Sequence, residues 1–409
     1  MKKLIALLLA LVMILGLVAC GAKTEEAPAE EAAEGKSIKV GLICIGDEND
    51  QGYTYNFIRG KEAATEILAD KGIDVEWVVK YNILEDAGCE DANIELAEEG
   101  CEVIINNSFG HEPFMLKVAP DYPEITFISC TNQASWGDDL DNTHNAFANI
   151  YEGRYCAGVV AGMKLQELID NGEIAAEEAV IGYVGAFSFA EVISGFTSYY
   201  LGAKSVCPSV TMKVQFVGSW SDATEEGNAA SALADMGCAL ISQHSDNATP
   251  ATTAQNKGIF HTGYNNDMIE VAPEASLIGT RIDWSVYFAH AIETVANGGE
   301  LEADWCHGMA DGAVVMTDLN EDIAAPGTAE KLAEVEEAIK AGEIKVFDTS
   351  TFTIGGAELT TSFALDTDGD FAPDSEEAVF DGAYNESYFQ SAPYFALSID
   401  GIEWLNEAF

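Results

Sequence analysis

Aromatic, amide and carboxylate side chains follow apolar runs at several points of this chain. Residues 46–56 read GDENDQGYTYN and come directly after the β-branched run at 37–45. They supply two rings, Tyr53 and Tyr55, and one amide, Asn56. Flat rings beside amide groups suit a flat, hydrogen-bonding ligand better than a sugar phosphate. An ordinary surface loop can have the same composition, so this segment is informative only because its chemistry recurs.

The same chemistry recurs after later apolar runs. The further candidates for ligand binding are Asn107, Phe187, Trp220, Gln243, Asp246, Asn265, Asp267 and Trp284. Each of them alone is more often structural, as a core aromatic or a hydrogen-bonded polar residue. Open α/β sheets, however, bind ligands outside the carboxyl ends of their strands. Because these residues stand at successive strand ends, the sequence predicts that they converge on one cleft.

The elements that position these residues alternate between strand and helix. The predicted strands cover residues 37–45, 74–79, 102–106, 125–128, 180–184, 211–217, 239–242, 258–262 and 277–280. Stretches with helical apolar spacing separate most of them. This alternation predicts an α/β fold with parallel sheets that are covered on both faces. The pattern restarts after a crossing near 145–150 and a long helix at 151–169, which indicates two Rossmann-like lobes.

We expect the following division of the chain. The N-terminal lobe covers 37–147, and residues 281–312 return to it. The C-terminal lobe covers 148–280, with residues 313–409 added to it, the last part as edge strands and surface loops. The length remaining after the first 36 residues suits two lobes of ordinary size.

The start of the chain has the pattern of an export signal. Lys2 and Lys3 precede an apolar run at 4–18, and small residues lead to Cys20. This is typical of a secretory signal peptide over 1–19. Its end resembles the bacterial lipobox, in which the cysteine is lipidated, as with palmitate. Residues 20–36 are acidic and alanine-rich, which predicts a flexible tether. We therefore expect an extracytoplasmic domain held at the cell membrane by a lipid on Cys20; ordinary cleavage or a retained anchor helix is the alternative.

The charge of the chain limits its partners. The 409 residues include 19 Lys and Arg against 69 Asp and Glu, a formal net charge of −50. Such a surface repels nucleic acid and anionic lipid. A neutral or cationic ligand fits it better than a strongly anionic one.

Neither the spacing of the cysteines nor the acidic stretch at 366–370 predicts a metal site. There are nine cysteines, and no C-x-x-C occurs. Several stand in apolar strand-like runs, where a free thiol acts as a small core residue, so we expect mostly free thiols after Cys20. Residues 366–370 alternate carboxylates as calcium loops do. Because Phe371 replaces the glycine of that pattern, we expect a solvated acidic turn rather than a calcium site.

Taken in order, a set of short motifs resembles one family. The motifs are Gly52-Tyr53-Thr54-Tyr55, Ser108-Phe109-Gly110, Glu152-Gly153-Arg154-Tyr155-Cys156-Ala157-Gly158, Ile181-Gly182-Tyr183-Val184-Gly185-Ala186-Phe187, Ser219-Trp220-Ser221-Asp222, Gln243-His244-Ser245-Asp246 and Gly263-Tyr264-Asn265-Asn266-Asp267-Met268. They are similar to those of the basic membrane protein (BMP) family. These are substrate-binding lipoproteins that serve ABC importers of purine nucleosides and nucleobases. The resemblance covers roughly residues 38–288.

The resemblance implies a type I periplasmic-binding-protein fold and a set of ligand contacts. The aromatic of the first loop and Trp220 would enclose a purine ring, while Asn56, Asp246 and the Asn265 region would hydrogen-bond it. The nucleoside-binding branch commonly has Asp where Asn265 stands and Lys near Thr280. Since this chain has neither, the resemblance favours a free nucleobase. It also implies permease and ATPase partners, and we expect a monomer without a cofactor.

Two other classes of function stay open. The chain lacks the phosphate-binding G-x-x-x-x-G-K-[ST], G-x-S-x-G and H-E-x-x-H, and its first βα turn lacks G-x-G-x-x-G. We therefore expect no enzyme. Nucleoside hydrolysis, with His244 beside Asp246 as a base, is the weakest alternative. The other is a ligand-sensing lipoprotein that reports to a surface receptor.

Overall fold

The computed structural model describes residues 36–131, 140–367 and 372–409. The predicted signal peptide, Cys20 and the tether up to residue 35 lie outside these residues, as do Asp368 and Asp370 of the acidic turn. None of the helices that the structure describes is both long and apolar enough to cross a membrane.

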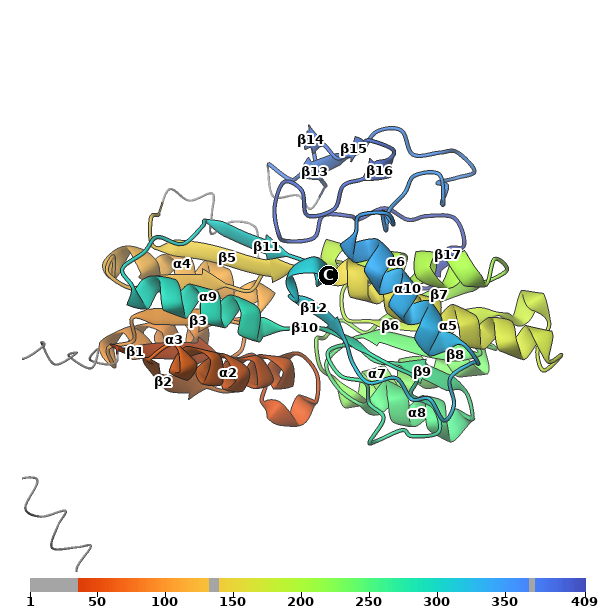
Figure 1. Cartoon of the computed structure of the whole chain (residues 1–409), viewed down its shortest axis with the longest axis horizontal. Coiled ribbons are helices and arrows are strands. Elements are labelled where there is room, and N and C mark those ends of the chain that lie inside the picture. The colour runs from red at the N-terminus through yellow and green to blue at the C-terminus, as the bar shows by residue number, and fades with distance from the viewer. Residues whose placement is uncertain (1–35, 132–139, 368–371) are drawn as a thin grey trace, which may run out of the picture. The chain divides into compact units, whose positions relative to one another are not determined.

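The strands within residues 36–148 form a parallel six-stranded sheet together with β11, which comes from much later in the chain (Figure 1). Its strand order is β11-β5-β4-β3-β1-β2. The strands are β1 (Lys36–Ile43), β2 (Ile73–Lys80), β3 (Val103–Asn106), β4 (Thr126–Ser129), β5 (Thr143–Ala148) and β11 (Asp304–His307). Helices α2 (Tyr53–Asp70) and α9 (Trp284–Ala296) cover one face, and α3 (Ala87–Glu98) and α4 (Glu112–Val118) cover the other. Since both faces are covered, β3 and β5 are buried along their whole length.

A second parallel sheet repeats this arrangement. Its order is β17-β7-β6-β8-β9. The strands are β6 (Val180–Gly185), β7 (Thr211–Phe216), β8 (Leu240–His244), β9 (Phe260–Thr262) and β17 (Ile402–Trp404). Helices α5 (Ile150–Asp170) and α6 (Ala190–Val206) cover one face, and α7 (Ala223–Asp235) and α8 (Thr249–Lys257) cover the other. In both sheets the first strand lies between the second and third, which puts the switch in strand order at β1 and at β6.

Short elements connect and extend the two sheets. β10 (Thr280–Ile282) pairs antiparallel with β12 (Val314–Met316), and α10 (Thr328–Lys340) packs on α5. The remaining strands are the two-stranded pairs β13 (Phe363–Leu365) with β14 (Ser375–Glu377) and β15 (Val379–Phe380) with β16 (Ala383–Tyr384). Single 3₁₀ turns are η1 (Glu48–Asp50), η2 (Phe109–His111), η3 (Ala119–Asp121), η4 (Ala176–Glu178) and η5 (Met309–Asp311).

One predicted boundary differs from the structure. β5 pairs with both β4 and β11 and runs to Ala148. The chain leaves the first sheet at Asn149, within the range 145–150 expected for the crossing, and α5 begins one residue later. The strand expected at 277–280 lies at Thr280–Ile282, where it pairs with β12. Both partners, β11 and β12, come from much later in the chain and do not show in local apolar spacing.

The last 60 or so residues contact both sheets. Ser391 N donates to Asp304 Oδ2 on β11 at 2.6 Å, and Asn145 Nδ2 on β5 donates to Ser391 Oγ at 2.9 Å. Farther along, β17 adds to the second sheet by pairing with β7. The segment therefore joins the edges of both sheets instead of belonging to one of them.

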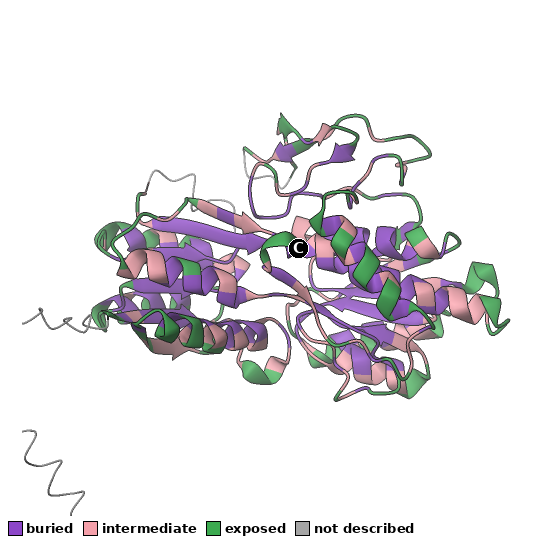
Figure 2. Ribbon diagram, in the orientation of Figure 1, coloured by how far each residue is buried: buried purple, intermediate pink, exposed green. Residues whose placement is uncertain are grey.

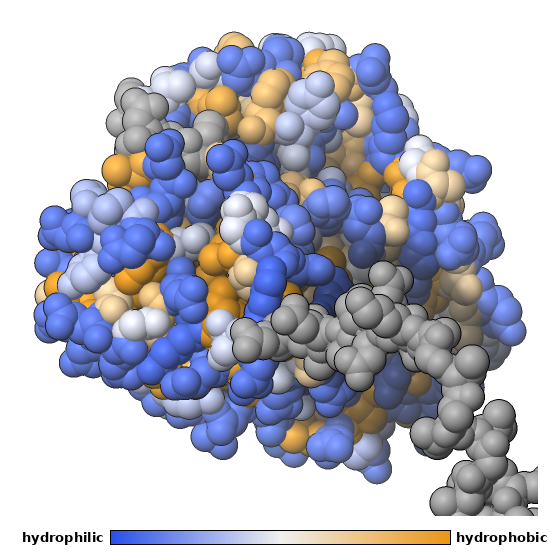
Figure 3. All heavy atoms as spheres, turned by 60° about the vertical axis from the view of Figure 1, so that its left-hand side comes forward, coloured by the Kyte–Doolittle hydropathy of each residue, from blue (hydrophilic) through white to orange (hydrophobic). Residues whose placement is uncertain are grey.

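The interior and the surface differ in chemistry as the composition predicts. The eight cysteines in the described parts of the chain are free thiols, seven of them buried, which confirms the expectation from spacing. The central strands of both sheets are mostly buried, whereas many helices expose one side (Figure 2). The face in Figure 3 is mostly hydrophilic, as the large excess of carboxylates requires.

Glu386 gives the fold a pH-dependent stability. Its carboxylate lies buried in the C-terminal segment, where Oε2 accepts a hydrogen bond from Phe395 N at 2.9 Å. Burial raises the pKa of Glu386 from 4.5 to about 8. The folded protein therefore holds a proton that the unfolded chain releases, and the associated stability is lost as pH rises from about 4.5 through about 8.

We expect Glu386→Gln to flatten this fall, because glutamine carries no titrating proton but keeps an accepting oxygen. Since one pKa unit corresponds to about 1.4 kcal/mol, the free energy of unfolding of the wild type should fall by about 2–4 kcal/mol more than that of the variant between pH 5 and 8. Urea denaturation at four pH values measures this. The exposed Glu343→Gln is the control, and equal slopes for wild type and E386Q would contradict the assignment.

Candidate functional site

A narrow cavity lies where the carboxyl ends of the two sheets meet. It is lined by Ile45, Tyr53, Ser108, Phe109, Thr131, Glu191, Trp220, His244, Asp246 and Tyr264. Every one of these residues stands at or shortly after the end of a strand, in β1, β3 and β4 of one sheet and in β6, β7, β8 and β9 of the other. We call it the inner cavity. It occupies the place where open α/β sheets bind ligands.

The inner cavity is small. Water centres can reach about 20 Å³ of it, little more than the roughly 10–15 Å³ that one water needs. The cavity in this structure therefore has no room for a bulky ligand.

Two aromatic rings reach the inner cavity from opposite sheets. Tyr53 is the first residue of α2, and its hydroxyl donates to the Cys130 carbonyl at 2.9 Å. Its ring packs against Phe57 with 4.9 Å between ring centres. Trp220 follows β7 and is supported by Phe187, whose ring lies edge-on at 5.2 Å. Both rings are held by their neighbours, so they offer fixed surfaces to a ligand.

The N-terminus of α2 is capped by carboxylates from both halves of the molecule. Asp50 accepts hydrogen bonds from Gly52 N at 2.8 Å, Thr54 N at 3.0 Å and Tyr55 N at 3.1 Å. The Tyr53 N–H is hydrogen-bonded to Asp246, which follows β8. The first N–H groups of a helix have no partner within the helix and attract negative charge. These two carboxylates supply that charge.

Asp246 is held close to α2 by the backbone as well as by its side chain. A Cβ placed on Gly52 would lie 2.7 Å from Asp246 Cα. Burial, and then repulsion from Asp50, Glu226 and Glu191, raise the pKa of Asp246 well above its ordinary value. Asp246 therefore favours a neighbour that donates a hydrogen bond or carries positive charge.

Two side chains outside the inner cavity hold the loop that carries Asp246 in place. Gln243 Nε2 donates to the carbonyls of Ser245 at 3.0 Å and Asn247 at 2.7 Å. Glu226 on α7 accepts from Ser245 Oγ at 2.6 Å and from Asn247. Gln243 thus positions Asp246 from outside the inner cavity.

A second carboxylate, Glu191, enters the inner cavity from α6. It is hydrogen-bonded to His244 Nε2 at 3.1 Å and accepts from the Tyr264 hydroxyl at 3.4 Å. Burial lowers the pKa of His244, so its ring is neutral at neutral pH. The lining therefore has two carboxylates and neither lysine nor arginine. Arg154 lies behind it, with its guanidinium 5.1 Å from the Tyr264 ring centre.

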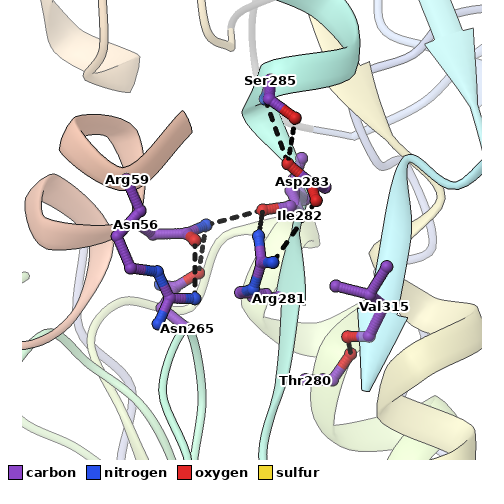
Figure 4. Close-up of polar contacts among 9 residues, drawn as sticks. All are labelled: Asn56, Arg59, Asn265, Thr280, Arg281, Ile282, Asp283, Ser285 and Val315. Carbon is purple, nitrogen blue, oxygen red and sulfur yellow. Dashed lines mark hydrogen bonds and ion pairs between the residues drawn. The ribbon is translucent and has the colours of Figure 1, made fainter. Parts of the chain in front are cut away.

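Among the predicted site residues, Tyr53, Trp220 and Asp246 line the inner cavity. Three of the predicted amide residues lie outside the inner cavity, because their side chains are hydrogen-bonded within the protein. Asn56 Nδ2 donates to Ile282 O at 2.9 Å and lies 3.5 Å from Asn265 Oδ1 (Figure 4). Asn107 Oδ1 accepts from Ile45 N at 2.9 Å. These three residues are buried and fix the connections around the inner cavity.

Four more predicted residues also lie outside the inner cavity. Tyr55 and Asp267 line a separate open pocket near η1, where the Arg59 guanidinium lies over the Tyr55 ring. Phe187 stands behind Trp220. Trp284 is fully buried in the core, with its ring 4.2 Å from that of Phe57.

Glu191 and Thr131 are polar lining residues that the sequence analysis did not name. Glu191 stands in the first turn of α6, where an acidic residue is common because of the helix dipole. A role at the N-terminus of the helix was therefore enough to explain it. Thr131 stands two residues after the end of β4 and has no aromatic or charged neighbour in the sequence. Its position after a strand end was the one signal that could have found it. Within the described ranges, no group of three His, Cys, Asp or Glu residues could hold a metal ion.

Comparison with known proteins identifies a family whose model matches most of this chain. A family model described as "ABC transporter substrate-binding protein PnrA-like" (Bmp) matches residues 37–350. A purine-binding protein of Brucella abortus is 33% identical over 313 residues, which cover 76% of this chain and 83% of the relative. A protein of Haloferax volcanii named for glucose binding by an ABC transporter is 28% identical, over 78% of this chain and 76% of its own.

Solved structures agree with the fold. A solute-binding protein from an ABC transporter system of Aeropyrum pernix superposes with a TM-score of 0.61 at 17% identity, over 76% of this chain and 93% of its own. A solute-binding protein from an ABC transporter system of Conexibacter woesei superposes with a TM-score of 0.57 at 18% identity, over 75% of this chain and 98% of its own. The predicted type I periplasmic-binding-protein fold is confirmed.

The contact at Gly52 yields a test of how the inner cavity is enclosed. We expect Gly52→Ala to push α2 away from Asp246, because the added methyl group meets backbone atoms that cannot rotate aside. The radius of gyration in small-angle X-ray scattering should increase. Gly88→Ala, also in the first turn of a helix, is the control, since its Cβ would meet only an Asp86 carboxylate oxygen at 3.1 Å. An unchanged radius for G52A would show that this contact does not hold the halves together.

Proposed function

The chain belongs to the Bmp family of PnrA-like ABC transporter substrate-binding proteins, and from this we propose that it captures a purine base in the inner cavity and delivers it to a membrane permease. Substrate-binding proteins of ABC transporters work outside the cytoplasm. They bind a small molecule and do not convert it, so no catalytic role is assigned to His244 or Asp246.

The observation that carries the proposal is that Tyr53 and Trp220 both line the inner cavity. Each ring follows a strand of a different sheet, and each packs against a neighbouring ring. Aromatic side chains in a small cavity favour a planar ring system, which loses its water-exposed faces on entry. The relative of Brucella abortus, named as purine-binding, supports the same ligand class.

The polar groups of the inner cavity favour a ligand rich in N–H donors. Asp246 and Glu191 are acceptors when ionised, and both stand in the lining. The N–H groups and exocyclic amine of an aminopurine would meet these acceptors. An anionic ligand would meet two carboxylates without a lining cation to offset them.

A free base fits better than a ribonucleoside. The positions that would hold ribose by family resemblance carry no charged group for sugar hydroxyls. Thr280 Oγ1 donates to Val315 O at 3.1 Å, and Asn265 Oδ1 lies 3.5 Å from Asn56 Nδ2. Asn265 Nδ2 is buried and has no hydrogen-bond partner among the described residues.

The two sheets mark the proposed lobes, 37–147 with 281–312 and 148–280 with 313–409. In our proposal a ligand favours the conformation in which these lobes are closed on it, and the closed form docks on the permease. The Asp246 contact with the N-terminus of α2 supports this, because it exists only while the halves are together.

The ligand is identified by what the purified protein retains and binds. Mass spectrometry of the denatured protein reports any co-purified base. Isothermal titration calorimetry with adenine, guanine, hypoxanthine, adenosine and glucose then ranks the candidates. We expect a purine base to bind most tightly; binding of glucose alone would reject the proposal in favour of the sugar named for the Haloferax volcanii relative.

Trp220→Ala should weaken binding of the base by about 1–3 kcal/mol, because stacking on one face of the ring is lost. Tyr53→Ala should act in the same direction. Tyr55→Ala is the matched control from the same loop, since Tyr55 lines a different pocket, and its dissociation constant should equal that of the wild type. Calorimetry measures all three. An unchanged constant for W220A would remove Trp220 from the site.

We also propose a lipid anchor on Cys20 and a tether up to residue 36. Cys20→Ala should release the domain from the membrane fraction, because the thioether that carries the lipid can no longer form. Ultracentrifugation of cell lysate and culture medium, followed by immunoblotting, measures the distribution. A control at Ala22→Ser leaves the cysteine intact. Full membrane retention of C20A would point to an uncleaved anchor instead.

A further inference from the structure

A second cavity adjoins the inner cavity and is walled by the C-terminal segment. Water centres can reach about 100 Å³ of it. It shares Phe109, Thr131 and Glu191 with the inner cavity. More than half of its lining residues lie beyond residue 350, past the end of the family match. We call it the outer cavity; nothing in the family assignment accounts for it.

The walls of the outer cavity are mostly apolar. Phe109 from the first sheet stacks on Phe189 from the second, with 5.3 Å between ring centres. Pro393, Ala396 and Phe409 face them from the C-terminal segment. Such walls bind hydrocarbon and aromatic groups by removing them from water.

The hydroxyl groups in these walls already have partners. Thr131 Oγ1 donates to Asn145 Oδ1 at 3.1 Å, and Ser188 Oγ accepts from Ala408 N at 2.9 Å. The Tyr394 hydroxyl donates to Asn385 O and accepts from Tyr388 N at 3.0 Å. Apart from the Glu191 and Asp366 carboxylates, which also line it, the outer cavity offers a ribose few groups to replace its hydrogen bonds to water, and unreplaced hydrogen bonds oppose binding.

We propose that the outer cavity is a subsite for an apolar substituent on the purine ring held in the inner cavity. The preferred ligand class is then an alkyl- or aryl-substituted purine base, ahead of both the bare base and its ribonucleoside. The proposal rests on the proposed function, because it needs the purine ring in the inner cavity. The shared residues Phe109, Thr131 and Glu191 put the two cavities side by side, so that a substituent on a ring in the inner cavity has only this shared wall to pass.

Calorimetry on the full chain tests this. The probes are adenine or guanine, whichever binds more tightly, its benzyl derivatives on the exocyclic amine and on N9, and its ribonucleoside. At least one benzyl derivative should bind ten times more tightly than the bare base, and the ribonucleoside more weakly than that derivative. Two positions are tried because the structure fixes the cavity and not the point of attachment.

Two variants test whether the outer cavity causes the tighter binding of the benzyl derivative. Ala396→Phe places a ring inside the outer cavity from a half-buried position, and should weaken the favoured benzyl derivative at least tenfold while leaving the bare base within twofold. Phe409→Ala, at a side chain that is 76% exposed, removes wall surface without disturbing the core and should weaken the benzyl derivative about threefold. Ala341→Phe, on the exposed end of α10, is the matched control. Thermal melting verifies that each variant is folded.

The outcomes separate the two proposals. If the bare base binds but neither benzyl derivative exceeds it, or if A396F weakens base and derivative equally, the subsite is overturned and the purine function stands. If no purine binds at all, the proposed function and the subsite fall together. A ribonucleoside that binds more tightly than every benzyl derivative also overturns the subsite.

Discussion

The site depends on one electrostatic contact, the N-terminus of α2 with carboxylates from both halves of the chain. Asp50 satisfies three of its N–H groups and Asp246 satisfies the fourth. The glycine at 52 allows the two backbones to touch there. This contact holds the loop after β8 against the start of α2, beside Tyr53. It also gathers acidic groups in a buried place, which raises the pKa of Asp246.

The fold followed from the sequence where burial is encoded locally. A parallel strand covered on both faces is largely apolar, and β3 and β6 show this in their own residues. The strand expected at 277–280 lies at Thr280–Ile282 because β10 pairs with β12, which comes later in the chain. Nothing within a few residues of Thr280 indicates such a partner, so apolar spacing alone placed the strand a few residues away.

The sequence predicted part of the site, and the side-chain chemistry of each residue explains why some predictions agree with the cavity lining and others do not. Tyr53, Trp220 and Asp246 were assigned to the cleft and line the inner cavity. Asn56, Asn107, Gln243 and Asn265 were assigned to it as well, yet each hydrogen-bonds the protein itself. A side-chain amide offers the same donors and acceptors as the peptide backbone. The sequence therefore cannot distinguish an amide that contacts a ligand from one that hydrogen-bonds the backbone of a loop. Glu191 was missed for the converse reason, since its position at a helix start already explained an acid there.

The C-terminal segment limits how far the two sheets can separate. Ser391 is bound to the first sheet through Asp304 and Asn145, and Ile402 belongs to the second through β17. The chain between them spans at most roughly 40 Å when fully extended. While both attachments last, this stretch restricts any opening on its own side, so the proposed opening and closing of the lobes would be widest on the opposite side.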